Sequence, residues 1–156
     1  MIARAALFVS SLGLTSCNAI VGIREPIDQP TAATPFVGTW ASSGTQVFKQ
    51  CTVKTDEGSA PASTLVISGE GSTVTFAFEG CAVKAIVDGD VATVTADQSC
   101  AVAGTGYTIF YDPTSAFVFT NEARTQARLD AVGIAEGPGN AACRFESKND
   151  YTKNGP

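Results

Sequence analysis

The five cysteines are the residues of this chain best suited to chemistry: Cys17, Cys51, Cys81, Cys100 and Cys143. The last four are not spaced as C-x-x-C, and the sequence has no histidine to act beside a thiol as a base or a zinc ligand. In an exported protein, disulfide formation is the expected use of such thiols. Five is an odd number, so if Cys17 is committed to another reaction, the other four can all pair.

Signatures of common catalytic sites are also missing. The sequence contains no P-loop, no dinucleotide-binding glycine pattern and no G-x-S-x-G nucleophile motif. Asp88-Gly89-Asp90 is acidic, but it lacks the spaced ligands and closing glutamate of a calcium loop, so it indicates a turn rather than a metal site. We therefore expect no enzymatic activity, no cofactor and no metal. Acid–base chemistry by carboxylates, tyrosine or lysine is the catalytic alternative left open, and a carboxylate pair leaves no sequence signature.

The first 16 residues have the organisation of a secretory signal peptide. Arg4 supplies a basic head, Ala5 to Leu14 form an apolar run, and small residues follow. This run is too short to span a membrane, which takes about 20 residues. The stretch Leu14-Thr15-Ser16-Cys17 resembles the lipobox of bacterial lipoproteins. That resemblance implies cleavage between Ser16 and Cys17, lipidation of Cys17 and a membrane anchor.

The segment from Cys17 to Pro35 is expected to be a tether. Pro26, Pro30 and Pro35 favour an extended, semi-rigid chain without a regular element. Asn18 follows the lipidated position. In enteric lipoproteins an aspartate there causes retention in the inner membrane, so the resemblance implies an outer-membrane location, periplasmic or surface-exposed.

The charge of the chain restricts its partners. The sequence carries 10 basic and 15 acidic residues, and removal of residues 1–16 with Arg4 leaves nine against 15, a net charge of −6. An acidic surface repels phosphate backbones and anionic lipid headgroups, which argues against nucleic acid and against electrostatic membrane docking. The lipid on Cys17 is therefore the expected membrane contact, with an unidentified envelope or surface partner.

Residues 36–153 are expected to form one β domain, followed by a tail at 154–156. Leu65 and Ile67 indicate one strand, and the alternation of Val74, Phe76 and Phe78 with smaller residues indicates another. The clearest hairpin runs from Cys81 to Thr95 around Asp88-Gly89, a favoured two-residue turn. The opposing pairs predicted from that turn are Val83–Val94, Lys84–Thr93 and Ala85–Ala92.

Two later segments complete the domain. Tyr107 to Phe119 is expected to form a second hairpin, which turns at Asp112-Pro113-Thr114-Ser115. Residues 121–135 have a helical composition but an alternating pattern around Leu129, and we favour a strand because a helix would bury only a thin alanine stripe. Gly137-Pro138-Gly139 then leads into a final strand around Cys143 and Phe145.

About eight short strands at regular spacing predict an all-β fold, either an antiparallel sandwich or a small up-and-down barrel. Cys81 and Cys100 bracket a hairpin and thus lie at one end of adjacent strands. Cys51 ends an early strand and Cys143 begins the last, and terminal strands meet when a barrel closes. Of the three possible pairings, we favour Cys81–Cys100 with Cys51–Cys143.

Gly38-Thr39-Trp40 resembles the G-x-W signature of lipocalins, in which the tryptophan plugs one end of an eight-stranded barrel and an arginine of the last strand stacks on it. The resemblance implies that Arg144 stacks on Trp40. It also implies a ligand site involving Trp40, Arg144, Phe76 and Phe78. The other interpretation, which we favour, is that Trp40 is an ordinary core residue of a small β domain and that the aromatic strands pack a closed interior.

A broader resemblance is to small, uncharacterised β-rich lipoproteins of myxobacterial type. It rests on the lipobox, the proline-containing tether, Gly38-Thr39-Trp40 and the cysteine that ends Gln98-Ser99-Cys100. It implies a cell-envelope location and disulfides, and it implies no activity. We expect a lipid-anchored protein with a non-enzymatic binding or structural role, the alternative being a lipocalin-like carrier of a small apolar ligand.

Overall fold

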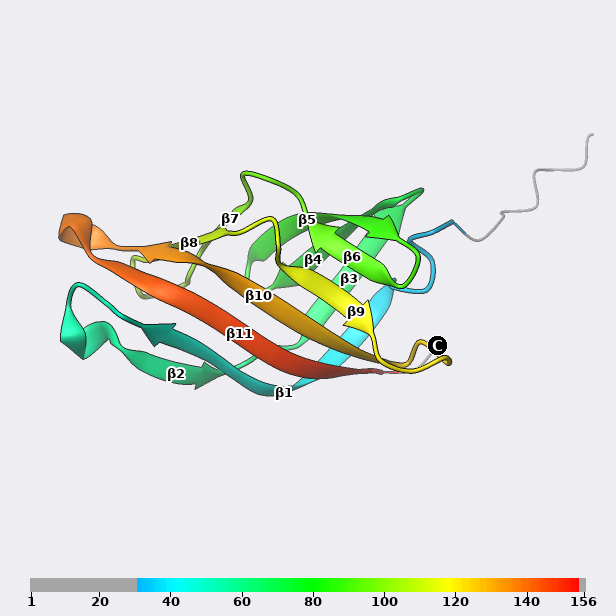
Figure 1. Cartoon of the computed structure of the whole chain (residues 1–156), viewed down its shortest axis with the longest axis horizontal. Coiled ribbons are helices and arrows are strands. Elements are labelled where there is room, and N and C mark those ends of the chain that lie inside the picture. The colour runs from blue at the N-terminus through cyan, green and yellow to red at the C-terminus, as the bar shows by residue number, and fades with distance from the viewer. Residues whose placement is uncertain (1–30, 155–156) are drawn as a thin grey trace, which may run out of the picture.

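The computed structural model describes residues 31–154, which form one antiparallel sheet with two short 3-10 turns (Figure 1). The predicted signal peptide, the cleavage site at Ser16 and the lipidation site at Cys17 lie outside the described residues. The 3-10 turns are η1 (Lys54–Asp56) and η2 (Pro138–Asn140). The strands are β1 (Gly38–Lys49), β2 (Gly58–Pro61), β3 (Leu65–Glu70), β4 (Thr73–Phe78), β5 (Cys81–Asp88), β6 (Val91–Val94), β7 (Ser99–Ala101), β8 (Thr108–Tyr111), β9 (Ala116–Phe119), β10 (Gln126–Glu136) and β11 (Ala142–Lys153).

The sheet closes on itself because β11 pairs with strands on both of its sides. It runs antiparallel to β10 from Ala142 to Thr152 and antiparallel to β1 from Arg144 to Lys153. The remaining wall follows chain order through β3, β4, β5, β6 and β9 to β10. The result is a closed eight-stranded up-and-down barrel, so the barrel prediction is confirmed and the sandwich alternative is wrong.

Three walls of the barrel are each made of two short strands in succession. β2 and β3 both pair with β1, β8 and β9 both pair with β10, and β6 and β7 pair with β9 and β8 respectively. β8 and β9 therefore run in the same direction. The second predicted hairpin is wrong in its turning point, since the chain reverses at Val102–Tyr107, where the Val102 N–H donates to the Tyr107 carbonyl at 2.8 Å.

Asp112–Ser115 does form the expected local turn, but this turn interrupts a wall of the barrel. The Ser115 N–H donates to the Asp112 carbonyl at 2.9 Å. The buried Ser115 hydroxyl then bonds to both the N–H and the carbonyl of Val132 on β10, each at 3.1 Å. The Ser115 hydroxyl thus takes the place of a backbone hydrogen-bond partner for Val132. The chain can therefore bulge at this turn and still remain part of the sheet.

The β5–β6 hairpin forms with a register shifted by two residues from the prediction. Ala85 lies opposite Val94, and Val87 lies opposite Ala92, so Gly89 and Asp90 are the central turn residues. Gly89 has φ of 58°, which suits the first central position of a type II′ turn. A shift of two residues leaves each side chain on the same face of the sheet, so the residues predicted to face inward still lie inside the barrel.

The segment 121–135 adopts the favoured strand from Gln126 onward. Asn121 closes the preceding turn, since its Oδ1 accepts the N–H groups of Thr125 and Gln126 at 3.0 and 3.1 Å. Apart from Leu129, the inward positions of β10 are small residues, and Ala127, Ala131 and Ala135 are all buried. Small side chains here leave the interior to larger groups on the facing strands.

The two predicted disulfides, Cys51–Cys143 and Cys81–Cys100, are both present. Cys51 follows the end of β1 and Cys143 lies at the start of β11, while Cys81 begins β5 and Cys100 lies in β7. The strand ends that carry these cysteines lie toward the left of the barrel in Figure 1, and we call this end the disulfide end. The opposite end, where residue 31 enters the barrel, is the plugged end.

Loss of either disulfide should destabilise the barrel to a degree set by the loop that it closes. The bridges span 92 and 19 residues. Loop-closure entropy then assigns about 4.5 kcal/mol to Cys51–Cys143 and about 3 kcal/mol to Cys81–Cys100. Urea unfolding of the two double alanine variants measures both losses. A larger loss for the shorter loop would contradict this explanation.

Candidate functional site

An aromatic cluster fills the plugged end of the barrel. Phe36 and Trp40 are fully buried, and the Trp40 indole N–H donates to the Phe36 carbonyl at 2.9 Å. Phe36 packs on Phe119 with ring centroids 4.3 Å apart, and Trp40 meets Phe117 edge-on at 5.1 Å. Trp40 thus plugs the barrel as the lipocalin resemblance implies, but it takes no part in the cavity described below.

The folded domain begins before the predicted boundary at residue 36. Residues 31–37 form a turn in which Ala33 is fully buried, and the Ala33 N–H donates to the Gly71 carbonyl at 3.0 Å. The described end of the predicted tether is therefore part of the plug. At the other terminus, the Asn154 N–H donates to the Thr39 carbonyl at 2.8 Å, which holds the start of the predicted tail against β1.

The cation beside Trp40 is Lys153, and the predicted stacking of Arg144 is wrong. Lys153 lies directly opposite Trp40 in the β1–β11 pairing, its Nζ 5.6 Å from the indole centroid. The same ammonium donates to the Pro35 carbonyl at 3.0 Å. Arg144 lies nine residues earlier on β11, opposite Lys49, and its Nε pairs with Glu146 at 2.8 Å. Even-numbered residues of β11 face outward, so the Arg144 side chain cannot reach the aromatic cluster at the plugged end.

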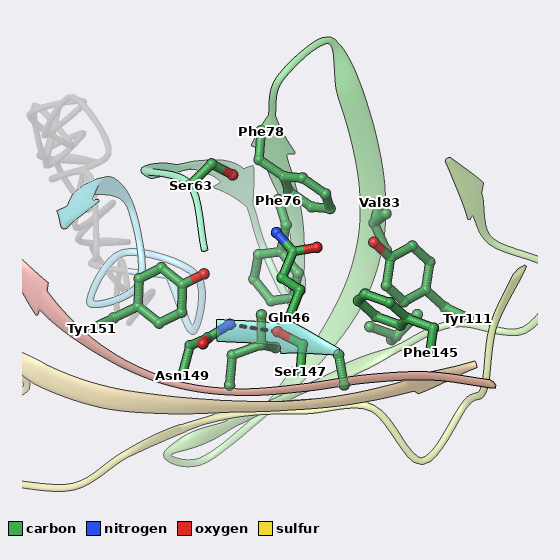
Figure 2. A pocket seen from close by; sticks show the side chains of 13 residues that line it. Gln46, Ser63, Phe76, Phe78, Val83, Tyr111, Phe145, Ser147, Asn149 and Tyr151 are labelled. Atoms are coloured by element: carbon green, nitrogen blue, oxygen red, sulfur yellow. Dashed lines mark hydrogen bonds between the residues drawn. The ribbon is translucent and has the colours of Figure 1, made fainter. Parts of the chain in front are cut away.

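A small cavity remains in the middle of the barrel (Figure 2). Its volume is about 30 Å³, enough for one or two water molecules. Phe76 and Phe78 line it as predicted, whereas Trp40 and Arg144 do not. The lining residues are Gln46, Ser63, Phe76, Phe78, Val83, Val94, Tyr111, Leu129, Ala131, Phe145, Ser147, Asn149 and Tyr151.

Asn149 is the most unusual residue of this lining. Only 1% of it is exposed, and its Nδ2 donates to the Ser147 hydroxyl. Its Oδ1 has no hydrogen-bond partner in the part of the chain that the structure describes. Gly44 faces it across the β1–β11 pairing, and a Cβ at position 44 would collide with that Oδ1. Most buried polar atoms in proteins are paired, so an unpaired acceptor calls for an explanation.

The cavity is uncharged at ordinary pH. None of its 13 lining residues is acidic or basic. Burial raises the pKa of Tyr111 far above its ordinary value of 10.0. Burial also raises the pKa of Tyr151, to about 12, while the Asn149 side chain acts in the opposite direction. Both phenols therefore remain neutral hydrogen-bonding groups beside an apolar wall.

The outer wall carries a wider depression of about 460 Å³ beside the Asp112–Ser115 bulge. Phe110 on β8 and Ile134 on β10 lie opposite each other there and are 45% and 51% exposed. Pro113 and Arg144 complete its rim, which places Arg144 on a surface rather than in an interior site. Exposed aromatic and aliphatic groups beside a guanidinium are typical of protein contact surfaces.

Several charged side chains of the described segment form ion pairs on the barrel surface. Glu146 bridges Lys49 and Arg144, at 2.5 and 2.8 Å, and Lys49 contributes most to holding the pKa of Glu146 below its ordinary value. Asp90, from the predicted acidic turn, pairs with Arg124 at 2.7 Å. In residues 31–154 no three acidic or cysteine side chains are placed to hold a metal ion.

The sequence indicated Phe76 and Phe78 as residues of the interior, but the polar groups there were not predicted. Ser147 and Asn149 could have been recognised, because they alternate in step with Cys143, Phe145 and Tyr151, which face inward. Polar side chains at inward positions of a strand indicate either a lumen or a specific contact.

Comparisons with protein-family models, with curated protein sequences and with solved structures gave no match to this chain. Within the part of the chain that the structure describes, no helix has the length and apolar character needed to cross a bilayer. The fold and the interior define the class of protein as an up-and-down eight-stranded barrel, plugged by aromatic residues at one end and closed by disulfides toward the other.

Replacement of Lys153 by methionine should destabilise the plug. Lys153→Met keeps an apolar stem beside Trp40 but removes the ammonium from the indole and from the Pro35 carbonyl. We expect the free energy of unfolding to fall by about 1–2 kcal/mol, measured by urea titration. Arg144→Met is the matched control and should cost less than about 0.5 kcal/mol, because its ion pair is exposed. The reverse order of the two losses would contradict the assignment.

The buried phenols should make the barrel sensitive to alkali. Tyr151 is protonated in both states below pH 10, but the unfolded chain loses this proton near pH 10 and the folded chain near pH 12. The free energy of unfolding should therefore fall as pH rises from 10 to 12, with about 3 kcal/mol lost through Tyr151. Tyr151→Phe should remove that part of the loss. Urea unfolding at pH 8 and pH 11.5 measures the difference, and equal losses in both proteins would refute it.

Proposed function

We propose that the chain is a lipid-anchored protein of the bacterial cell envelope with a non-enzymatic binding role. The observation that carries the proposal is the pairing of Cys51, Cys81, Cys100 and Cys143 in two disulfides. Such a pattern fits an oxidising compartment. It leaves Cys17, which ends the lipobox-like stretch, as the fifth cysteine of the sequence and the one available for lipidation.

The arrangement of the barrel is compatible with an anchor at its N-terminal side. The described chain starts at the plugged end with Thr31 (Figure 1). The segment that follows Cys17 therefore joins the domain at this end, and the disulfide end is the opposite one. The exposed pair Phe110 and Ile134 lies toward that farther end, opposite the first half of β11. A surface of this kind supports contact with another macromolecule of the envelope.

A lipocalin-like carrier of a small apolar ligand is the second candidate function, and the largely apolar lining of the central cavity favours it. The cavity of about 30 Å³ is much smaller than an ordinary ligand pocket, and the aromatic cluster at Phe36, Trp40, Phe117 and Phe119 is packed rather than hollow. A carrier function for a large apolar ligand would therefore need a substantial expansion of the barrel. The ligand-binding experiment in the next subsection tests this candidate.

Metabolic labelling with a fatty-acid analogue tests the anchor. In a bacterium that processes lipoproteins, the wild-type chain should be labelled, whereas Cys17→Ala should be unlabelled and retain residues 1–16. Asn18→Gln is the matched control, because it leaves Leu14-Thr15-Ser16-Cys17 intact, and it should be labelled like the wild type. Unchanged labelling of Cys17→Ala would refute the proposed anchor.

A further inference from the structure

The interior of the barrel contains a hydrogen-bond acceptor that has no donor among residues 31–154. Asn149 is 1% exposed, lines the central cavity and has an unpaired Oδ1. A buried acceptor without a donor destabilises a fold, and a leucine of similar volume would avoid that cost. Gly44 lies opposite Asn149, and its lack of a Cβ leaves the space that the Asn149 side chain occupies.

We propose that the central cavity is a binding site for a small uncharged molecule that carries an O–H or N–H donor on an apolar body. Asn149 Oδ1 would accept the hydrogen bond from that donor. This inference rests on the binding role proposed above, but it does not depend on the lipid anchor.

The surroundings of Asn149 restrict the chemistry of the ligand. The hydroxyls of Tyr111 and Tyr151 and the amide of Gln46 face the same space (Figure 2). No ionic side chain lines the cavity, so a charged ligand would lose its hydration without gaining a counter-charge. Phe76, Val94 and other apolar side chains form the rest of the wall and favour a ligand with an apolar body.

A path into the cavity would pass between Gln46 and Phe78. These two residues line both the central cavity and a second cavity of about 30 Å³ toward the disulfide end, which Cys100 and Ile109 also border. A benzene-sized molecule occupies a cavity of about 150 Å³, which is more than the two spaces provide together, so the barrel must also widen around them before such a molecule can bind. Phe78 is only half-buried and ends β4, so movement of its side chain is the step that entry of the ligand would require.

Phenol and toluene are the probes for the test because they have the same shape and differ in one donor. The protein is the full chain carrying Cys17→Ala, purified with both disulfides formed, so that no acyl group competes for the probes. Binding is followed by nuclear magnetic resonance titration of the backbone amides around the cavity. We expect saturable binding of phenol, about tenfold tighter than that of toluene, since a tenfold ratio is the typical contribution of one hydrogen bond.

Asn149→Leu separates a binding role from a structural one. In this variant the preference for phenol over toluene should disappear, while the urea midpoint should equal or exceed that of the parent chain. Asn154→Leu makes the same chemical change at an exposed position and should keep the preference.

Three results would overturn the inference: no saturable phenol binding by the parent chain, equal affinity for the two probes, or a lower urea midpoint for Asn149→Leu. The last would show that Asn149 is satisfied within the fold, for example by enclosed water. Acyl labelling of Cys17 is independent of all three, so failure here and failure of the proposed anchor are distinguishable.

Discussion

The rest of the structure depends on the pairing of the first and last strands. β1 and β11 share ten residue pairs, from Trp40 opposite Lys153 to Lys49 opposite Arg144, and this ladder converts a meander into a closed barrel. Closure leaves each inward side chain only a narrow shared interior, so bulky groups on one wall require small groups on another. The alanines of β10 and the large aromatic residues of β4, β9 and β11 satisfy this requirement together. The Cys51–Cys143 bridge fixes the same two strands at the disulfide end.

Features encoded by neighbouring residues could be predicted from the sequence. The alternation from Cys81 to Val94 gave the correct inward faces, and the strand at 126–135 followed from its period of two despite a helical composition. Both disulfides were predictable because they require only that adjacent strands share an end. Hairpin registers and turning points were less predictable. The Asp112–Ser115 turn has suitable residues, and it forms. The residues of the turn do not determine whether the chain then reverses or continues along the same neighbouring strand. Here it continues along β10, because Ser115 bonds to the backbone of Val132.

The site at the plug illustrates the same limit at the level of single residues. Trp40 was recognisable from its neighbours, but its cationic partner was assigned to Arg144 instead of Lys153. Both residues are on the last strand, and only the register of a ladder between residues more than 100 positions apart determines which one faces the indole. The polar interior escaped prediction for a related reason. Ser147 and Asn149 had inward parity, but their importance depends on the glycine that faces Asn149 and on the absence of a donor for its Oδ1 within the described fold.

The plugged end and the middle of the barrel differ in how far the fold uses their polar groups. At the plugged end, the indole N–H, the Lys153 ammonium and four aromatic rings are all used by the fold, so little there is left for a ligand. The middle of the barrel differs, because the neutral amide of Asn149 lines a small cavity there, which the half-buried ring of Phe78 also borders. A barrel selected only for stability gains nothing from an unpaired amide oxygen, since apolar side chains of similar size are tolerated in well-packed interiors. An amide oxygen without a donor among the described residues, placed opposite a glycine, therefore fits an interior that receives a donor from outside better than one that is simply filled.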